Sequence, residues 1–235
     1  MTIAESPLFR ELETSDAKAT APIVEVLTKY PKRVLLALGA RVGVDVAFYT
    51  FVLFITTYIA TYLELPRSYA LNAVLVAAAV QVFLIPWFGH LSDRFGRRPV
   101  YLFGAVGSAA WVFVFFALLD TGSFLLILLA TVVSLVFHAA MYGPQASFIA
   151  EMFPTRVRYT GASMGYQLAG ILGGALAPII SVALLDRFDT SLVVSAYVVL
   201  MLAVTTVCVL LSPETSRIDL RADTTAHPTA SRGGS

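Results

Sequence analysis

Long apolar stretches alternate with short polar segments along this chain, and the alternation predicts its architecture. The apolar stretches are expected at residues 34–62, 70–90, 98–119, 123–149, 161–185 and 190–211. Each reaches the roughly 20 residues that a helix needs to cross a hydrocarbon core about 30 Å thick. Backbone groups in lipid must be hydrogen-bonded within their own segment, so we expect helices and no open strands. The pattern therefore predicts an all-α, polytopic membrane protein with six transmembrane helices.

Polar segments flank this region and complete the predicted domain organisation. Residues 1–33 lack the short apolar core of a secretory signal, so we expect the first apolar stretch to remain as a membrane anchor. Residues 212–235 are polar and rich in Thr, Ala, Ser and Gly towards their end, which is typical of a disordered tail. We expect a cytoplasmic segment at 1–33, a transmembrane domain at 34–211 and a cytoplasmic, largely disordered tail at 212–235.

The basic residues lie mostly on one predicted side of the membrane. That side carries Arg10, Lys18, Lys29, Lys32, Arg33, Arg94, Arg97, Arg98, Arg156, Arg158, Arg217, Arg221 and Arg232. The opposite side carries Arg67 and Arg187. Cytoplasmic segments are enriched in Lys and Arg, so both termini and both basic loops are predicted to be cytoplasmic. We expect a multi-pass protein of the plasma membrane, in contact with the lipid bilayer.

Composition and motifs narrow the function further. Charged residues make up only 13% of the chain, whereas a soluble domain carries about a quarter. No phosphate-binding loop, dinucleotide fingerprint, hydrolase elbow or zinc spacing occurs, so we expect no cofactor, no metal and no enzyme. The basic residues are confined to short membrane loops, which argues against a nucleic-acid partner.

Two opposite charges within the first apolar stretch are the main candidates for chemistry. Arg41 and Asp45 lie four residues apart on one helix face, which Tyr49 continues. At 1.5 Å per residue, Asp45 lies about 16 Å beyond Val34, near the middle of the membrane. The pair could simply neutralise itself. Alternatively, Arg41 would bind a substrate carboxylate and Asp45 would carry a proton.

The other intramembrane candidates lie in later stretches. His138, one turn before Tyr142, is either a structural histidine or a site of proton exchange. Gln81, Tyr166 and Gln167 are weaker candidates for hydrogen bonds to a substrate.

The basic loop between the second and third stretches carries the strongest motif. It reads Gly89-His90-Leu91-Ser92-Asp93-Arg94-Phe95-Gly96-Arg97-Arg98-Pro99, and we expect a charged loop across this whole range. Its arginines could only set the topology, or could form with Asp93 a gate whose contacts break when the protein changes conformation. The string resembles the G-x-L-[SA]-D-[RK]-x-G-R-[RK] signature of the major facilitator superfamily, which lies between the second and third helices of a six-helix half.

Three further segments resemble the metabolite:proton symporter family of that superfamily. Residues 151–168, which include Glu151, Arg156 and Arg158, resemble its tenth loop and eleventh helix. Residues 212–215 resemble the end of its last helix, and residues 5–13 resemble its central loop. Glu151 would pair with Arg156, with Arg158 or with the arginines of the first basic loop, as part of a cytoplasmic gate.

The resemblance implies a function, and two alternatives remain open. It implies the carboxyl-terminal half of a twelve-helix transporter, with symport of a proton and a small organic acid or zwitterion by alternating access. A second six-helix half would be its partner, and we expect the gene to be split, truncated or misannotated. The first alternative is a non-transporting membrane subunit or a truncated remnant. A membrane-embedded enzyme is a weaker one.

Overall fold

Every regular element of the computed structural model is a helix, within the residues that it describes, 22–214. The elements are α2 (Pro22–Lys29), α3 (Pro31–Tyr49), η1 (Thr50–Phe54), α4 (Ile55–Thr57), η2 (Tyr58–Tyr62), α5 (Arg67–Phe95), α6 (Arg97–Leu119), α7 (Phe124–Glu151), η3 (Thr155–Val157), α8 (Arg158–Ala169), η4 (Gly170–Ala175), α9 (Leu176–Phe188) and α10 (Ser191–Leu211). The predicted all-α fold class is confirmed for this part of the chain. The central-loop resemblance at 5–13 and the tail from 215 onward lie outside it.

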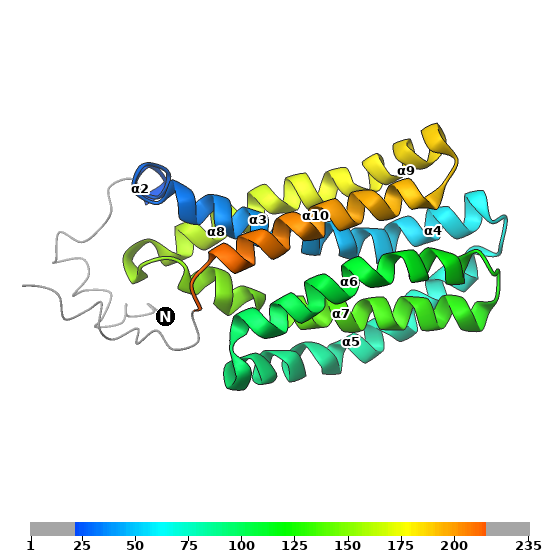
Figure 1. Ribbon diagram of the computed structural model, residues 1–235, viewed down its shortest axis with the longest axis horizontal. Coiled ribbons are helices and arrows are strands. Elements are labelled where there is room, and N and C mark those ends of the chain that lie inside the picture. The colour runs from blue at the N-terminus through cyan, green and yellow to red at the C-terminus, as the bar shows by residue number, and fades with distance from the viewer. Residues whose placement is uncertain (1–21, 215–235) are drawn as a thin grey trace, which may run out of the picture.

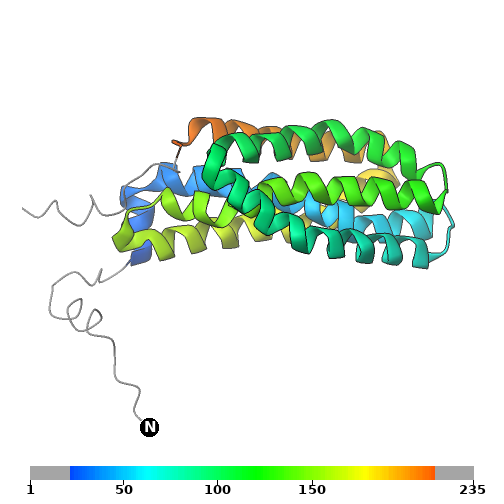
Figure 2. The ribbon, with the colours of Figure 1, turned by 90° about the horizontal axis from the view of Figure 1, so that it is seen from below.

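The described elements form six spans, which we number in chain order. They run over Pro31–Tyr62, Arg67–Phe95, Arg97–Leu119, Phe124–Glu151, Thr155–Phe188 and Ser191–Leu211, and each is long and apolar enough to cross a membrane. The predicted six-helix organisation is therefore confirmed. The spans lie along the long axis of the bundle, with α2 and the end of α10 at the same end (Figures 1 and 2). We call this the basic end, because it carries Arg97 and Arg156, and the other the opposite end.

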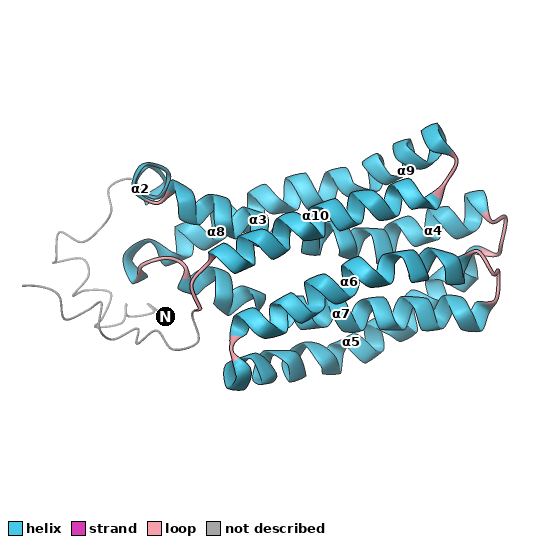
Figure 3. Ribbon diagram, viewed as in Figure 1, coloured by secondary structure: helices cyan, strands magenta, loops and turns pink. Residues whose placement is uncertain are grey.

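The first span lies at the centre of the packing. Two thirds of its most apolar window is buried (67%), whereas the second span buries 22% and faces outward. It packs against the fifth and sixth spans, while the fourth span packs against the second and third. The third and sixth spans also pack together. The first three spans and the last three therefore interlock instead of forming two separate bundles (Figure 3).

The connections at the basic end are shorter than the sequence predicted. The expected loop at 89–99 is wrong for most of its length, because α5 continues to Phe95 and α6 starts at Arg97. Gly96 alone separates them, with a φ of +104° that suits glycine. Similarly, the fifth span begins at Thr155 and not near residue 161. Polar residues continue a helix beyond the apolar stretch, so hydropathy underestimates its length.

Wider π-helical turns interrupt two of the spans. Two of these segments, η1 and η2, lie in the outer part of the first span, and η4 lies in the fifth. The break at η4 has a local cause, since Pro178 has no N–H to donate to the carbonyl four residues earlier. Such turns often occur at functional sites. Here η1 begins directly after Tyr49, and Gly174 of η4 lies beside the Tyr49 ring.

Candidate functional site

A cavity of about 350 Å³ lies where the first, second and fourth spans meet. Its lining comprises Arg41, Asp45, Phe48, Tyr49, Gln81, Ile85, His138 and Tyr142. We call it the central cavity. The structure thus brings together six of the eight candidates for binding substrate and proton, namely Arg41, Asp45, Tyr49, Gln81, His138 and Tyr142. Gln167 is exposed and does not line the cavity, whereas its neighbour Tyr166 contacts Arg41.

Arg41 is held from three helices. Its Nε donates to Asp45 Oδ2 at 3.0 Å, and its Nη1 donates to Gln145 Oε1 at 3.3 Å. The guanidinium also lies 4.1 Å from the ring centroid of Tyr166, in cation–π geometry. Only 16% of the Arg41 side chain and 10% of the Asp45 side chain are exposed. The charge of Arg41 is therefore compensated inside the bundle and not by bulk water.

A buried hydrogen-bond chain stands behind Arg41. Gln145 Nε2 donates to the hydroxyl oxygen of Tyr101 at 3.1 Å, and that hydroxyl donates to the carbonyl of Ala40 at 2.8 Å. Gln145 and Tyr101 are both fully buried. Together these bonds fix the Gln145 amide so that its oxygen faces Arg41. Neither Gln145 nor Tyr101 was among the residues predicted for the site, because their polarity within apolar spans is their only signal in the sequence.

His138 forms the opposite wall of the cavity. Gln81 Nε2 lies 2.7 Å from His138 Nδ1 and 3.4 Å from the carbonyl oxygen of Leu135. The carbonyl can only accept, so the amide nitrogen belongs at this position, and Nδ1 accepts from it. The neutral ring then carries its hydrogen on Nε2. The ring also packs on Phe48 and Tyr142, with centroids 4.9 and 5.4 Å away.

A second group of predicted residues meets at the basic end. Arg97 donates to both carboxylate oxygens of Glu151, at 2.7 Å each, and to Asp93 at 3.1 Å. The paired side chains of Arg97 and Glu151 are 13% and 14% exposed. This bidentate pair joins the third span to the fourth, and Asp93 adds the second. Of the alternatives for Glu151, the structure shows the pairing with the first basic loop.

The end of the sixth span is tied to the same group. The Glu214 carboxylate accepts from the backbone N–H groups of Arg97 and Arg98, at 3.1 and 3.2 Å. These are free donors of the first turn of α6, where a negative charge also suits the helix dipole. Arg98 Nη2 donates to the carbonyl of Leu210 at 2.6 Å. The second, third, fourth and sixth spans are therefore linked around Arg97.

The other three predicted gate arginines have partners outside the network around Arg97. Arg156 pairs with Glu25 of α2 at 3.3 Å, and Arg158 donates to the carbonyl of Phe153 at 3.2 Å. Arg94 stacks on its neighbour Phe95, 5.8 Å from the ring centroid. None of the three contacts Glu151 within the described residues, so the network around Arg97 is smaller than the predicted gate.

Comparison with known proteins settles the family. The family model described as Major Facilitator Superfamily matches residues 37–231, which is most of the chain. The chain belongs to the major facilitator superfamily. The family suggested by the sequence motifs is thus confirmed.

Several curated relatives in this superfamily are named as transporters. The chain is 32% identical to the shikimate transporter of Escherichia coli (strain K12), over 73% of its own length and 40% of the relative's. It is 30% identical to an inner membrane metabolite transport protein of the same organism, over 92% and 50% of the two lengths. It is 26% identical to the proline/betaine transporter of that organism, over 86% and 42%.

The names of these relatives bear on the prediction of a transporter, and their lengths bear on the prediction of a six-helix half. Their names confirm that the chain belongs with transporters and not with enzymes. The chain spans about half the length of the curated relatives it matches. No solved structure matches it.

Proposed function

We propose that this chain is the carboxyl-terminal half of a symporter that moves a small organic acid or zwitterion together with a proton. It would work by alternating access with a second six-helix half, in the plasma membrane and with both termini in the cytoplasm. The observation that carries the proposal is the buried Arg41–Asp45 pair in the wall of the central cavity. An ionisable pair at this depth is costly and usually serves an ion or a substrate.

Charge balance in the cavity gives the coupling. Arg41 and Asp45 contribute one positive and one negative charge, so the net charge of the pair is zero. A carboxylate arriving alone, or a proton arriving alone, would leave one uncompensated charge where the dielectric constant is low. If Asp45 is protonated and Arg41 pairs with the carboxylate, the net charge is zero again. The two ligands therefore favour each other, which is the requirement for symport.

The names of the relatives support the substrate class. One relative is named for shikimate, a carboxylate, and another for proline and betaine, which are zwitterions with a carboxylate. Arg41 offers the forked donors that suit this shared group.

The contacts around Arg97 fit the role of a cytoplasmic gate. They join four spans at one end of the bundle and consist of ion pairs and hydrogen bonds, which can break without leaving a packing defect. Opening of the central cavity to the cytoplasm would separate Arg97 from Glu151. Closure would restore the pair.

Proton uptake on binding tests the proposal without needing transport. The chain is reconstituted in nanodiscs, and shikimate binding is measured by calorimetry in buffers of different ionisation enthalpy. We expect close to one proton taken up per carboxylate, and tighter binding as the pH falls. Asp45→Asn should bind without proton uptake and with little pH dependence, whereas Arg41→Gln should weaken binding by about 30-fold or more. Binding without proton uptake in the unaltered chain would contradict the coupling.

Uptake into vesicles tests transport itself. The chain is co-reconstituted with a candidate amino-terminal half, and labelled shikimate is followed under an imposed proton gradient. We expect accumulation that an uncoupler abolishes. A full-length relative serves as the working control. If the pair shows no uptake while the control does, the transport proposal fails.

One alternative is a non-transporting membrane subunit or a truncated remnant of such a transporter. The neighbouring gene sequence discriminates between them. A reading frame that encodes six further spans favours the split transporter.

A further inference from the structure

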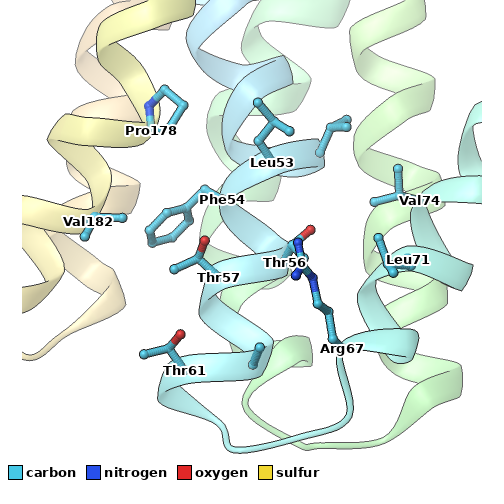
Figure 4. Close-up of a pocket in the computed structure, with 12 residues that line it drawn as sticks. Leu53, Phe54, Thr56, Thr57, Thr61, Arg67, Leu71, Val74, Pro178 and Val182 are labelled. Carbon is cyan, nitrogen blue, oxygen red and sulfur yellow. The ribbon is translucent and has the colours of Figure 1, made fainter.

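A second and larger cavity lies towards the opposite end of the bundle. Its volume is about 580 Å³, and the first, second and fifth spans line it (Figure 4). Its polar lining consists of Thr56, Thr57, Thr61 and Arg67. We call it the outer cavity, because it lies away from the basic end. Its volume is in the range of sites for small molecules.

The polar groups of the outer cavity are not used by the protein itself. Threonine hydroxyls in helices usually donate to a backbone carbonyl of the preceding turn. Thr50, Thr131 and Thr206 do so here, each at 2.8 Å. The three threonines of the outer cavity make no such bond, nor any other, within residues 22–214.

Arg67 is likewise without an ion pair among the described residues. Its side chain extends from the first residue of α5 towards Thr56 on the neighbouring helix (Figure 4). No acidic residue lines this cavity, so nothing in its wall neutralises the guanidinium. Phe54, Leu71 and Val182 supply apolar wall beside it. The combination presents one cation, several hydroxyls and an apolar surface to a ligand.

The outer and central cavities follow each other along the first span. Tyr49 lines the central cavity, and Val52, less than one turn further on, lines the outer one. Thr57 lies twelve residues beyond Asp45, which is about 18 Å along a helix. The two cavities are therefore neighbours along the first span, with Tyr49 and Asp45 on the side of the central cavity nearer to the outer one.

We propose that the outer cavity is a second binding site for the carboxylate substrate, centred on Arg67, which the substrate occupies before it reaches the central cavity. The proposal rests on the proposed function. The guanidinium would bind the carboxylate in its forked geometry, the threonine hydroxyls would bind further polar groups, and the apolar wall would hold the carbon skeleton. Because no carboxylate lines this cavity, binding at this site would take up no proton.

Variants that remove each arginine separate the two sites. Equilibrium dialysis with labelled shikimate is done on the whole chain in phosphatidylcholine nanodiscs. In Arg41→Gln, we expect weaker, millimolar binding to remain and to be independent of pH. Adding Arg67→Gln should weaken this remaining binding at least tenfold, and Thr57→Val with Thr61→Val should weaken it severalfold. Arg187→Gln, which removes the other arginine of this end from outside the cavity, is the matched control and should have no effect.

Two ligands and a second lipid identify what binds at Arg67. Choline, a cation without a carboxylate, should not compete for the remaining site, whereas glycine betaine should. If phosphatidylglycerol in the nanodisc displaces shikimate from Arg41→Gln but not from Arg41→Gln with Arg67→Gln, the site belongs to a lipid headgroup and the proposal is overturned.

The remaining outcomes distinguish this inference from the proposed function. If Arg41→Gln leaves no shikimate binding, or if Arg67→Gln does not weaken it, the outer site is refuted while the central site stands. If Arg41→Gln leaves binding unchanged and without proton uptake, and Arg67→Gln abolishes binding, the outer site stands and the proposed central site fails.

Discussion

Arg41 is held by three residues from three different helices, and this arrangement fixes where its charge points. Asp45 lies one turn away on the same helix, Gln145 on α7 and Tyr166 on α8. Asp45 is the only one of these three partners that carries a charge. Protonation of Asp45 would therefore weaken the strongest of the three contacts that Arg41 makes. The other two would keep the guanidinium in place for an incoming carboxylate.

Gln145 is therefore predicted to position Arg41. Gln145→Leu removes the acceptor for Arg41 Nη1 and the donor to Tyr101, and should raise the dissociation constant for shikimate about tenfold. Buried groups left without partners should also cost about 1–3 kcal/mol of stability. Calorimetry and thermal unfolding in detergent measure the two effects.

Ser134→Ala is the matched control for this change. Ser134 is buried on the same helix but donates only to the carbonyl of Ala130, at 2.8 Å. Its loss should leave shikimate binding unchanged. An equal loss of binding in both variants would show that α7 is merely disturbed, and Gln145 would have no positioning role.

Only some of the residues in and behind the central cavity could be predicted from the sequence. Arg41, Asp45 and Tyr49 could be grouped because the four-residue spacing puts them on one helix face. His138 and Tyr142 could be linked in the same way. Gln145 and Tyr101 could not, because their roles depend on how α6 and α7 approach α3, which no local spacing encodes. For the same reason the sequence could not tell whether Tyr166 or its neighbour Gln167 lies beside Arg41, since one residue changes the helix face by about 100°.

At the scale of elements, close approach of the first and fifth spans shapes the site. A Cβ atom added at Gly173 would lie 2.5 Å from the carbonyl oxygen of Val42 and 3.1 Å from Cβ of Asp45. Small residues allow such approach between helices in a membrane. The fifth span is rich in glycine, which suits close packing, but the sequence alone does not tell which of its glycines face a neighbour.

Gly173→Ala should push the two spans apart. We expect a loss of about 1–3 kcal/mol, seen as a lower midpoint of thermal unfolding in detergent, together with weaker shikimate binding. Gly170→Ala is the control, because an added Cβ there meets nothing within 4 Å. Equal effects of the two variants would argue against the close approach at Gly173.

The ion pair between the third and fourth spans is predicted to be strongly coupled. A double-mutant cycle with Arg97→Gln and Glu151→Gln should give a coupling of about 1–3 kcal/mol, because the pair is bidentate and mostly buried. The pair of Arg156 with Glu25, whose arginine is 54% exposed, should give less than about 1 kcal/mol. Comparable values for the two cycles would remove the energetic basis for a gate at Arg97.

At the scale of the whole molecule, both ends of the described chain lie at the basic end of the bundle (Figure 1). This follows from an even number of spans, so the sequence predicted it from hydropathy alone. The lengths of the links were not predictable in this way, because polar residues at 90–95 remain helical beyond the apolar stretch.

Thiol labelling is expected to show which side this end faces. In a Cys208→Ser background, single cysteines replace Arg94 and Arg187 at opposite ends, and a membrane-impermeant reagent is applied to whole cells and to inverted vesicles. The cysteine at 94 should react only in inverted vesicles, and the cysteine at 187 only in cells. The reverse pattern would place the basic end outside and undo the proposed orientation.

The position of the π-helical turns gives the first span an uneven stiffness. From Pro31 to Tyr49 it is regular α-helix, and from Thr50 to Tyr62 the hydrogen-bond ladder changes register repeatedly. A helix whose hydrogen bonds are regular in one half and irregular in the other bends in its irregular half. Bending of this span would therefore change the shape of the outer cavity around Thr57 and Arg67. Arg41 and Asp45 lie in the regular half and would keep their positions.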